Sequence, residues 1–326
     1  MPARDVRVLA FHATYGCRDS GVCCTSDWPI PIEADRLEQA QAAIECRQLT
    51  PARGAAGPAF VLSPDAPADA PAVLATCDGA CVFHDPAGRC AIQGALGHDA
   101  LPLACRQFPR VSVIDPRGVS VTLSHYCPTA AALLGADADP EGVFVTNPSR
   151  FPAEAEYVGL DATTVMPPVL RPSVLMDWES WWEFERLSVR TLLTAGDSAA
   201  GALAWVRGAA AAVRRWSPGQ GNLIDAVRSA FGAAPMPSVV PAEALIAEST
   251  GAVPIEYRDR ARWVETMPTD DRTARRFLAA HAFANWAIHS EQGLSGWLRS
   301  VEQAFAFIEA GAGVRHADLV LRHLRA

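Results

Sequence analysis

The cysteines of this chain are concentrated in its first 127 residues. The sequence has 326 residues and nine cysteines, and none of the nine follows Cys127. Eight of them stand in segments rich in Gly, Pro and Asp: Cys17, Cys23, Cys24, Cys77, Cys81, Cys90, Cys105 and Cys127. This uneven distribution indicates metal binding, because thiolates are ligands for zinc and iron and short loops let several of them converge. Cys46 stands alone in a predicted helix and is interpreted as a core or surface residue.

A disulfide framework is the alternative use for so many thiols. The N-terminal segment carries Arg4, Asp5 and Arg7 and has no apolar run of the kind found in signal peptides. No stretch approaches the roughly 20 apolar residues of a membrane-spanning helix. We therefore expect a cytoplasmic protein with no membrane association, in which thiols stay reduced and clustered ones bind metals. Cysteines can also serve as small apolar side chains in a core. That role readily explains a single cysteine, but it explains eight of them poorly.

The spacing of the thiols leaves the metal open. It is neither that of a zinc ribbon, with two Cys-x2-Cys knuckles, nor that of the ferredoxin runs. Adjacent Cys23 and Cys24 point in different directions, so both rarely bind one ion. Eight thiols suit one four-iron cluster with spares, or two four-thiolate metals. We favour iron–sulfur over zinc because the ligands are spread widely and not paired in knuckles. His84 and His125 are further candidate ligands, or donors of hydrogen bonds to ligands.

The predicted fold class is mainly α. We expect a cysteine-rich, irregular N-terminal domain with a small β-hairpin (residues 1–135), a connector (136–172) and an all-helical domain (173–326). Residues 108–114 and 118–123 have β-branched side chains at alternate positions and flank a segment with turn chemistry, which predicts the hairpin. Apolar residues on one face predict a helix over 33–49. The later predicted helices are 129–134, 176–195, 198–216, 222–231, 242–249, 255–266, 270–289, 295–309 and 314–325.

Several of the cysteine motifs resemble a known family. Cys17, the Cys23-Cys24 pair, the segment 81–92 and the segment 104–110, which reads Ala-Cys-Arg-Gln-Phe-Pro-Arg, are similar in order to a cysteine-cluster domain described as zinc- or iron-chelating. Its members include the YkgJ-type proteins and the flagellin lysine-N-methylases. Segments 28–32, 109–110 and 126–131 are similar to the methylase branch in particular. The resemblance covers about residues 11–135, and Ser20 stands where the family's opening motif has a cysteine.

The resemblance implies a metal centre on the eight thiols, either an iron–sulfur cluster of the 4Fe–4S type or zinc. For the methylase branch it also implies S-adenosylmethionine as cofactor and a protein substrate such as flagellin. The residues alone give methylation no support, because the usual Gly-rich strand-to-helix turn is absent and segment 54–57 is a poor substitute.

Two function classes therefore stay open. One is a protein-lysine N-methyltransferase. The other is a non-catalytic metal-binding carrier, sensor or assembly factor whose helical domain docks a partner protein. The net charge of −8 argues against nucleic acid as the partner, because nucleic-acid-binding proteins normally present a basic face.

Overall fold

The chain forms two compact units. The computed structural model describes residues 5–26, 28–53, 57–62, 69–137, 142–152, 157–233, 241–258 and 269–323. One unit, here called the helical unit, comprises Met1–Tyr15, Arg110–His125 and Ala130–Ala326. The other, here called the cysteine unit, comprises Gly16–Pro109 and Tyr126–Thr129, and it contains all nine cysteines. Among the described residues, no helix has the length and apolar character needed to cross a membrane.

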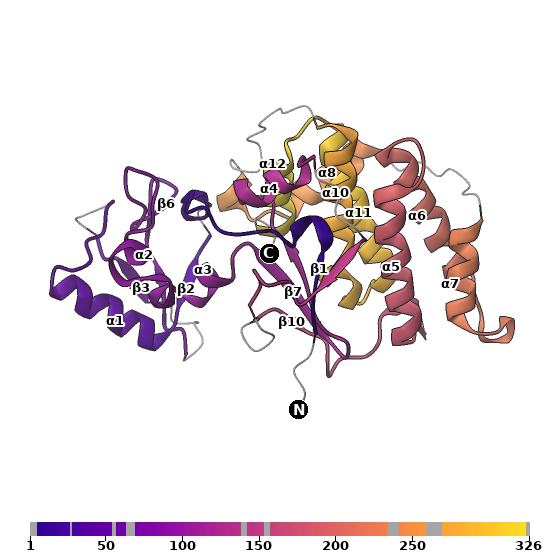
Figure 1. Cartoon of the computed structure of the whole chain (residues 1–326), viewed down its shortest axis with the longest axis horizontal. Helices are drawn as coiled ribbons and strands as arrows, with labels where there is room; N and C mark the ends of the chain where they lie inside the picture. Colours follow the sequence, from indigo (N-terminus) through magenta and orange to yellow (C-terminus); the bar gives the residue numbers. More distant parts are fainter. Residues whose placement is uncertain are drawn as a thin grey trace. The chain divides into compact units, whose positions relative to one another are not determined.

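A five-stranded sheet lies within the helical unit (Figure 1), in the order β10-β7-β8-β1-β9. The strands are β1 (Asp5–Leu9), β7 (Arg110–Asp115), β8 (Gly118–Leu123), β9 (Phe144–Thr146) and β10 (Leu160–Asp161). β7 and β8 pair in antiparallel register, which confirms the predicted hairpin. β1 pairs in parallel with β8 and antiparallel with β9. Gly118 lets β1 approach, because a Cβ there would lie 2.2 Å from the carbonyl oxygen of Asp5.

Helices make up most of this unit. They are α4 (Pro128–Leu134), whose first two residues belong to the cysteine unit, α5 (Trp178–Thr194), α6 (Ala199–Arg214), α7 (Leu223–Gly232), α8 (Ala242–Gly251), α10 (Asp271–Ala282), α11 (Gly293–Glu309) and α12 (Val314–Asp318). A small hairpin of β11 (Val169–Arg171) and β12 (Val174–Leu175) precedes α5. Asp177 caps α5 by accepting a hydrogen bond from the Ser180 amide. α5 packs against α10 and buries Trp181 and Phe184, so its tryptophan-rich face serves the core.

Three predicted helices differ from the observed ones. The helix predicted over 270–289 ends at Ala282, because Ala284 takes a φ of 51° and its amide donates to buried Glu185 at 3.3 Å. The chain continues as a 3-10 turn at Trp286–His289. The helix predicted over 314–325 passes from α12 into a π-helical turn, Leu319–His323. The helix predicted over 255–266 begins as a 3-10 turn at Ile255–Tyr257, and residues 259–268 lie outside the described part.

Short elements build the cysteine unit. The strands β2 (Ile30–Ile32), β4 (Ala72–Leu74) and β3 (Phe60–Leu62) form an antiparallel sheet in that order. A tight hairpin pairs β5 (Thr76–Cys77) with β6 (Ala80–Cys81). The helices are α1 (Ala34–Glu45), α2 (Ala91–Leu96) and α3 (Leu103–Gln107). Ile32, Phe83 and Ile92 are fully buried in its core, and Cys24 and Cys81 belong to the same core.

The chain as a whole is mainly helical with small sheets, as predicted. The two compact units divide it differently from the predicted ranges 1–135, 136–172 and 173–326. The hairpin of β7 and β8 lies in the helical unit, as does β1. The cysteine unit is therefore formed by the segment inserted between β1 and β7, together with the short segment Tyr126–Thr129.

Candidate metal centre

The Cys23-Cys24 pair lies in a 3-10 turn, Val22–Thr25. Gly21 precedes it in the left-handed conformation, with a φ of 66°. A Cβ at Gly21 would lie 1.9 Å from the carbonyl oxygen of Gly88 and 2.8 Å from His84 Nε2. Only glycine allows this approach, which presses the Cys23-Cys24 turn against the turn that leads into Cys90.

Cys90 is the N-cap residue of α2. The backbone amides of Ile92 and Gln93, in the first turn of that helix, contribute to lowering the pKa of its thiol. An isolated bridge between His84 and Cys90 closes the turn on the other side. The thiol is thus held where a helix terminus favours negative charge.

Three thiols form a hydrogen-bonded chain, with Cys24 between Cys23 and Cys90. Hydrogen bonding with Cys24 lowers the pKa of Cys23, and the same effect lowers the pKa of Cys90 to about 7. The Cys24 hydrogen bonds to Cys23 and Cys90, aided by burial, raise the pKa of Cys24. Cys24 therefore keeps its proton while its two neighbours are closest to the thiolate form.

Two more thiols lie close enough to Cys23 and Cys90 to interact with them electrostatically. Burial raises the pKa of Cys81 to about 11, and the nearby thiols of Cys90 and Cys23 add to the shift. Burial also raises the pKa of Cys105, with further contributions from Cys23, Cys90 and Cys81. Five thiols from four separate segments thus share one region: the 22–25 turn, the β5–β6 hairpin, the start of α2, and α3. We call these five the thiol cluster.

The remaining predicted ligands are placed differently. Cys17 is exposed, and it interacts electrostatically with Cys127 and with Cys23 of the thiol cluster. Cys17 and Cys127 therefore lie at the edge of the thiol cluster. Cys127 is buried where α4 begins. Cys77 is partly buried against the core that contains Cys24 and Cys81, and its sulfur lies 3.7 Å from an Asp78 carboxylate oxygen. Cys46 is exposed at the C-cap of α1, as expected for a residue outside the centre.

All nine cysteines are free thiols, with no disulfide among them. In the described part of the chain, no three His, Cys, Asp or Glu side chains are arranged closely enough to hold a metal ion. The thiols of the thiol cluster are therefore neighbours that do not converge on one point among the described residues. Their side chains must rotate toward one another before they can ligate a common metal.

The two histidines considered as ligands have other contacts. The Arg53 guanidinium lies 3.4 Å from His84 Nδ1, and its Nε donates to the His84 carbonyl oxygen at 3.1 Å. His125 is fully buried in the helical unit, where its Nε2 lies 3.1 Å from His12 Nε2. Comparisons of the chain with protein-family models, with curated proteins and with solved structures return no match.

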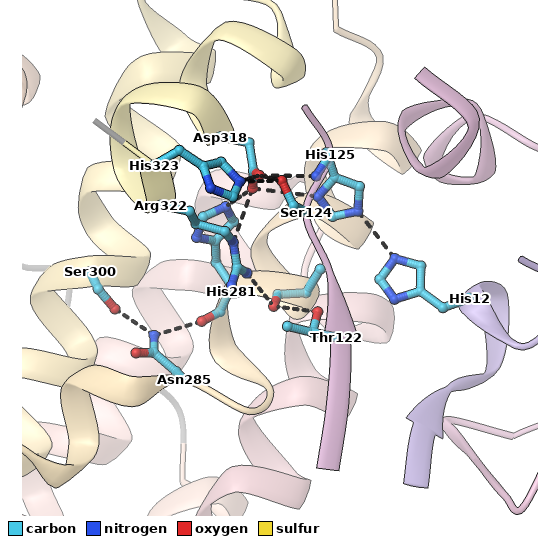
Figure 2. A network of polar contacts seen from close by, with 11 residues as sticks. His12, Thr122, Ser124, His125, His281, Asn285, Ser300, Asp318, Arg322 and His323 are labelled. Carbon is cyan, nitrogen blue, oxygen red and sulfur yellow. Dashed lines mark hydrogen bonds and ion pairs between the residues drawn. The ribbon is translucent and has the colours of Figure 1, made fainter. Parts of the chain in front are cut away.

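Sequence analysis missed a second group of functional interest, a buried polar network around Asp318 in the helical unit (Figure 2). Its members come from residues 122–125, 280–285 and 318–323, and from His12 and Ser300. Histidines and acids scattered over distant segments carry no spacing motif. The weak signal was the pairing of Asp318 with Arg322, four residues apart on a predicted helix.

Proposed function

We propose that this cytoplasmic protein binds an iron–sulfur cluster or zinc through the thiols of its cysteine unit, as a member of the cysteine-cluster family that its motifs resemble. Four of the five cluster thiols would be the ligands. Cys23, Cys90 and Cys105 are the best placed, because each interacts with the others. Cys24 or Cys81 would complete the set. Cys17 and Cys127 lie at the edge and would serve as outer ligands or replacements.

The observation that carries this proposal is the gathering of five free thiols from four segments into one region. Thiols are weak hydrogen-bonding groups, so hydrogen bonds among them explain poorly why a fold would bring so many together. Soft sulfur donors are the preferred ligands of zinc and iron–sulfur clusters. A bound metal would displace the thiol protons, since thiolates are the ligating form, and its binding free energy would stabilise this small unit.

The fit is better for an iron–sulfur cluster than for one zinc ion. A 4Fe–4S cluster is larger than a single ion and accepts four cysteines that are spread more widely. The five thiols of the thiol cluster are neighbours that do not converge on one point, which suits the larger iron–sulfur cluster. A bound iron–sulfur cluster would supply electron transfer or would anchor the fold of the cysteine unit. The backbone amides of α2 would favour the thiolate form of Cys90 in either case, because they contribute to lowering its pKa.

The test is metal analysis and absorption spectroscopy of protein purified without oxygen, with cysteine variants. Cys105→Ser should lose most of the bound metal, and the melting temperature should fall with it. Cys46→Ala is the matched control, because Cys46 is exposed and apart from the cluster. Cys77→Ser should also keep its metal, because the Cys77 sulfur contacts the Asp78 carboxylate. Equal metal loss in Cys105→Ser and Cys46→Ala, or metal-free wild-type protein after iron supplementation, would contradict the proposal.

The resemblance of segments 28–32, 109–110 and 126–131 to the flagellin lysine-N-methylases favours a catalytic version of this function. In that version the metallated protein binds S-adenosylmethionine and methylates a lysine of a partner protein. Ligand that binds the folded state raises the melting temperature with concentration. A rise with S-adenosylmethionine in metal-replete protein is the expected result. If there is none, a non-catalytic carrier, sensor or assembly factor is the better reading.

A further inference from the structure

A cavity of about 390 Å³ opens in the helical unit between β7 and the C-terminal turns. Val111 and Val158 form part of its apolar wall, and Trp286 lies beside them. His281, Arg322 and His323 form part of its polar wall. The volume is in the range of about 300–1,000 Å³ that is usual for small-molecule sites, and the mixture of apolar walls with few polar groups is typical of them.

Asp318 holds the polar wall in place through hydrogen bonds (Figure 2). This fully buried carboxylate accepts hydrogen bonds from Ser124 Oγ at 2.6 Å, from His281 Nε2 at 3.0 Å and from Arg322 Nε at 3.0 Å. Ser124 Oγ in turn lies 2.6 Å from His323 Nε2. Burial raises the pKa of Asp318, but Arg322 and the hydrogen bonds from His125 and His281 outweigh it, and the pKa lies well below its usual value. Asp318 is thus an ionised acceptor.

This hydrogen bond determines the tautomer of His281. An ionised carboxylate can only accept, so the proton of the neutral imidazole is on Nε2 and the lone pair is on Nδ1. The ring lines the cavity, and its one side-chain hydrogen bond within the described residues is the bond through Nε2. His281 therefore presents a hydrogen-bond acceptor whose orientation is set by Asp318, in an arrangement that holds imidazoles rigid in binding sites.

Trp286 is an exposed aromatic side chain with a fixed position. Half of its surface is accessible, which is unusual for tryptophan, yet its indole N–H donates to the Ser112 carbonyl oxygen at 3.0 Å. Asn285 supports this turn: its Nδ2 donates to the His281 carbonyl and to Ser300 Oγ, and its Oδ1 accepts from the Ala287 amide. The indole face at the cavity is thus held ready without being covered by protein.

We propose that this cavity is a binding site for a planar aromatic small molecule that carries an O–H or N–H donor on its edge. The ring stacks on Trp286, as aromatic rings do on exposed indoles. The edge donor meets Nδ1 of His281, and the remaining N–H groups of Arg322 are available to an acceptor beside it. The proposal is independent of the metal centre, since every residue named here belongs to the helical unit.

The test uses 7-hydroxycoumarin as a fluorescent probe and 7-methoxycoumarin as its matched control, which has the same ring but no donor. Full-length protein should bind the hydroxyl compound saturably, with one site per chain. The methoxy compound should bind about three- to tenfold more weakly, the effect of one hydrogen bond. Trp286→Ala should weaken both compounds about tenfold or more, as expected for a lost stacking contact.

His281→Gln separates the two roles of the histidine. The glutamine amide can still donate to Asp318 from the place of Nε2, but the Nδ1 acceptor is gone. The preference for the hydroxyl compound should therefore disappear while the melting temperature changes little. Trp216→Ala is the control for the loss of an indole, because Trp216 also donates to a carbonyl, that of Gly221 at 3.1 Å, and lies outside the cavity.

Three results would overturn the proposal. They are no saturable binding of either coumarin by wild-type protein, binding unchanged by Trp286→Ala, and equal affinity of wild-type protein for the two compounds. Should His281→Gln fail to fold, the comparison of the two coumarins and the half-exposed Trp286 position still decide the question. Metal content is measured in the same samples. Failure of coumarin binding can then be distinguished from failure of the proposed metal binding.

Discussion

Gly21 offers the most direct test of how the thiol cluster is assembled. Gly21 has a left-handed φ of 66° and closely approaches the turn before Cys90. Gly21→Ala introduces two costs at once. An L-residue in this conformation costs about 1–2 kcal/mol. A Cβ placed 1.9 Å from the Gly88 carbonyl oxygen forces two backbone segments apart, and overpacking of this kind typically costs about 1–3 kcal/mol more.

Two further glycines in the same unit separate these costs. Gly88 has a φ of 80°, but a Cβ there would have only one neighbour within 4 Å, at 3.9 Å. Gly88→Ala should therefore cost the backbone term alone, about 1–2 kcal/mol. Gly94 lies in α2 with open space around it, so Gly94→Ala should be stabilising by up to about 1 kcal/mol. Gly21→Ala should total about 2–5 kcal/mol.

Hydrogen exchange measures these differences locally, which matters because a chain of two compact units need not unfold in one step. Peptides covering 22–26 and 88–96 should exchange faster in Gly21→Ala than in Gly88→Ala. Metal content should fall in the same order, because the Cys23-Cys24 turn is moved away from Cys90. Equal protection in the two variants would refute the argument that close approach at Gly21 positions the thiols.

Three other predictions concern titration, thiol reactivity and a buried charge. Burial lowers the pKa of His281 and of His323 to about 4, so as the pH falls these histidines take up protons in the unfolded chain before they do so in the folded one. The free energy of unfolding should therefore be steady above pH 6.5 and fall by up to about 3 kcal/mol per histidine as the pH approaches 4. A free energy of unfolding that does not change with pH in urea titrations would contradict this. In metal-free protein at pH 7, iodoacetamide should label Cys90, with its pKa of about 7, faster than Cys105, whose pKa burial raises; mass spectrometry of the labelled peptides decides. Glu185→Ala should destabilise by about 1–3 kcal/mol in calorimetry, because it removes the buried acceptor of the Ala284 amide and one of the two carboxylates that pair with Arg117, which keeps Asp115; an unchanged melting temperature would argue against a structural role for this carboxylate.

Local patterns predicted local structure well. The apolar stripe of α5 and the turn chemistry between β7 and β8 depend on near neighbours, and both elements were predicted within a few residues. β1 was not predicted, since five residues gain a strand conformation only from β8 and β9, which follow more than a hundred residues later. The break after Ala282 depends on Glu185, a residue of another helix. Long-range partners of this kind leave no periodic trace in the sequence.

The thiols illustrate the same limit at the level of the site. Cysteine count and order were enough to nominate eight residues, but not to sort them. Cys77 and Cys81 are four residues apart and look equivalent in the sequence. The β5–β6 hairpin buries Cys81 near Cys90 and leaves Cys77 beside Asp78. The network around Asp318 was missed entirely, because Ser124, His281 and Asp318 are brought together only by packing.

The position of β1 has a consequence for biosynthesis. Translation delivers this strand before its partner β8, which emerges only after the whole of Gly16–Pro109. The segment with eight of the nine cysteines therefore leaves the ribosome while the N-terminal strand still waits for its place. Arg110 later lies 6.0 Å from the ring of Tyr15, so both ends of the inserted segment are joined only when the sheet closes. Under the proposed function, early metal loading is to be sought in ribosome-bound chains whose cysteines have left the exit tunnel while β8 has not.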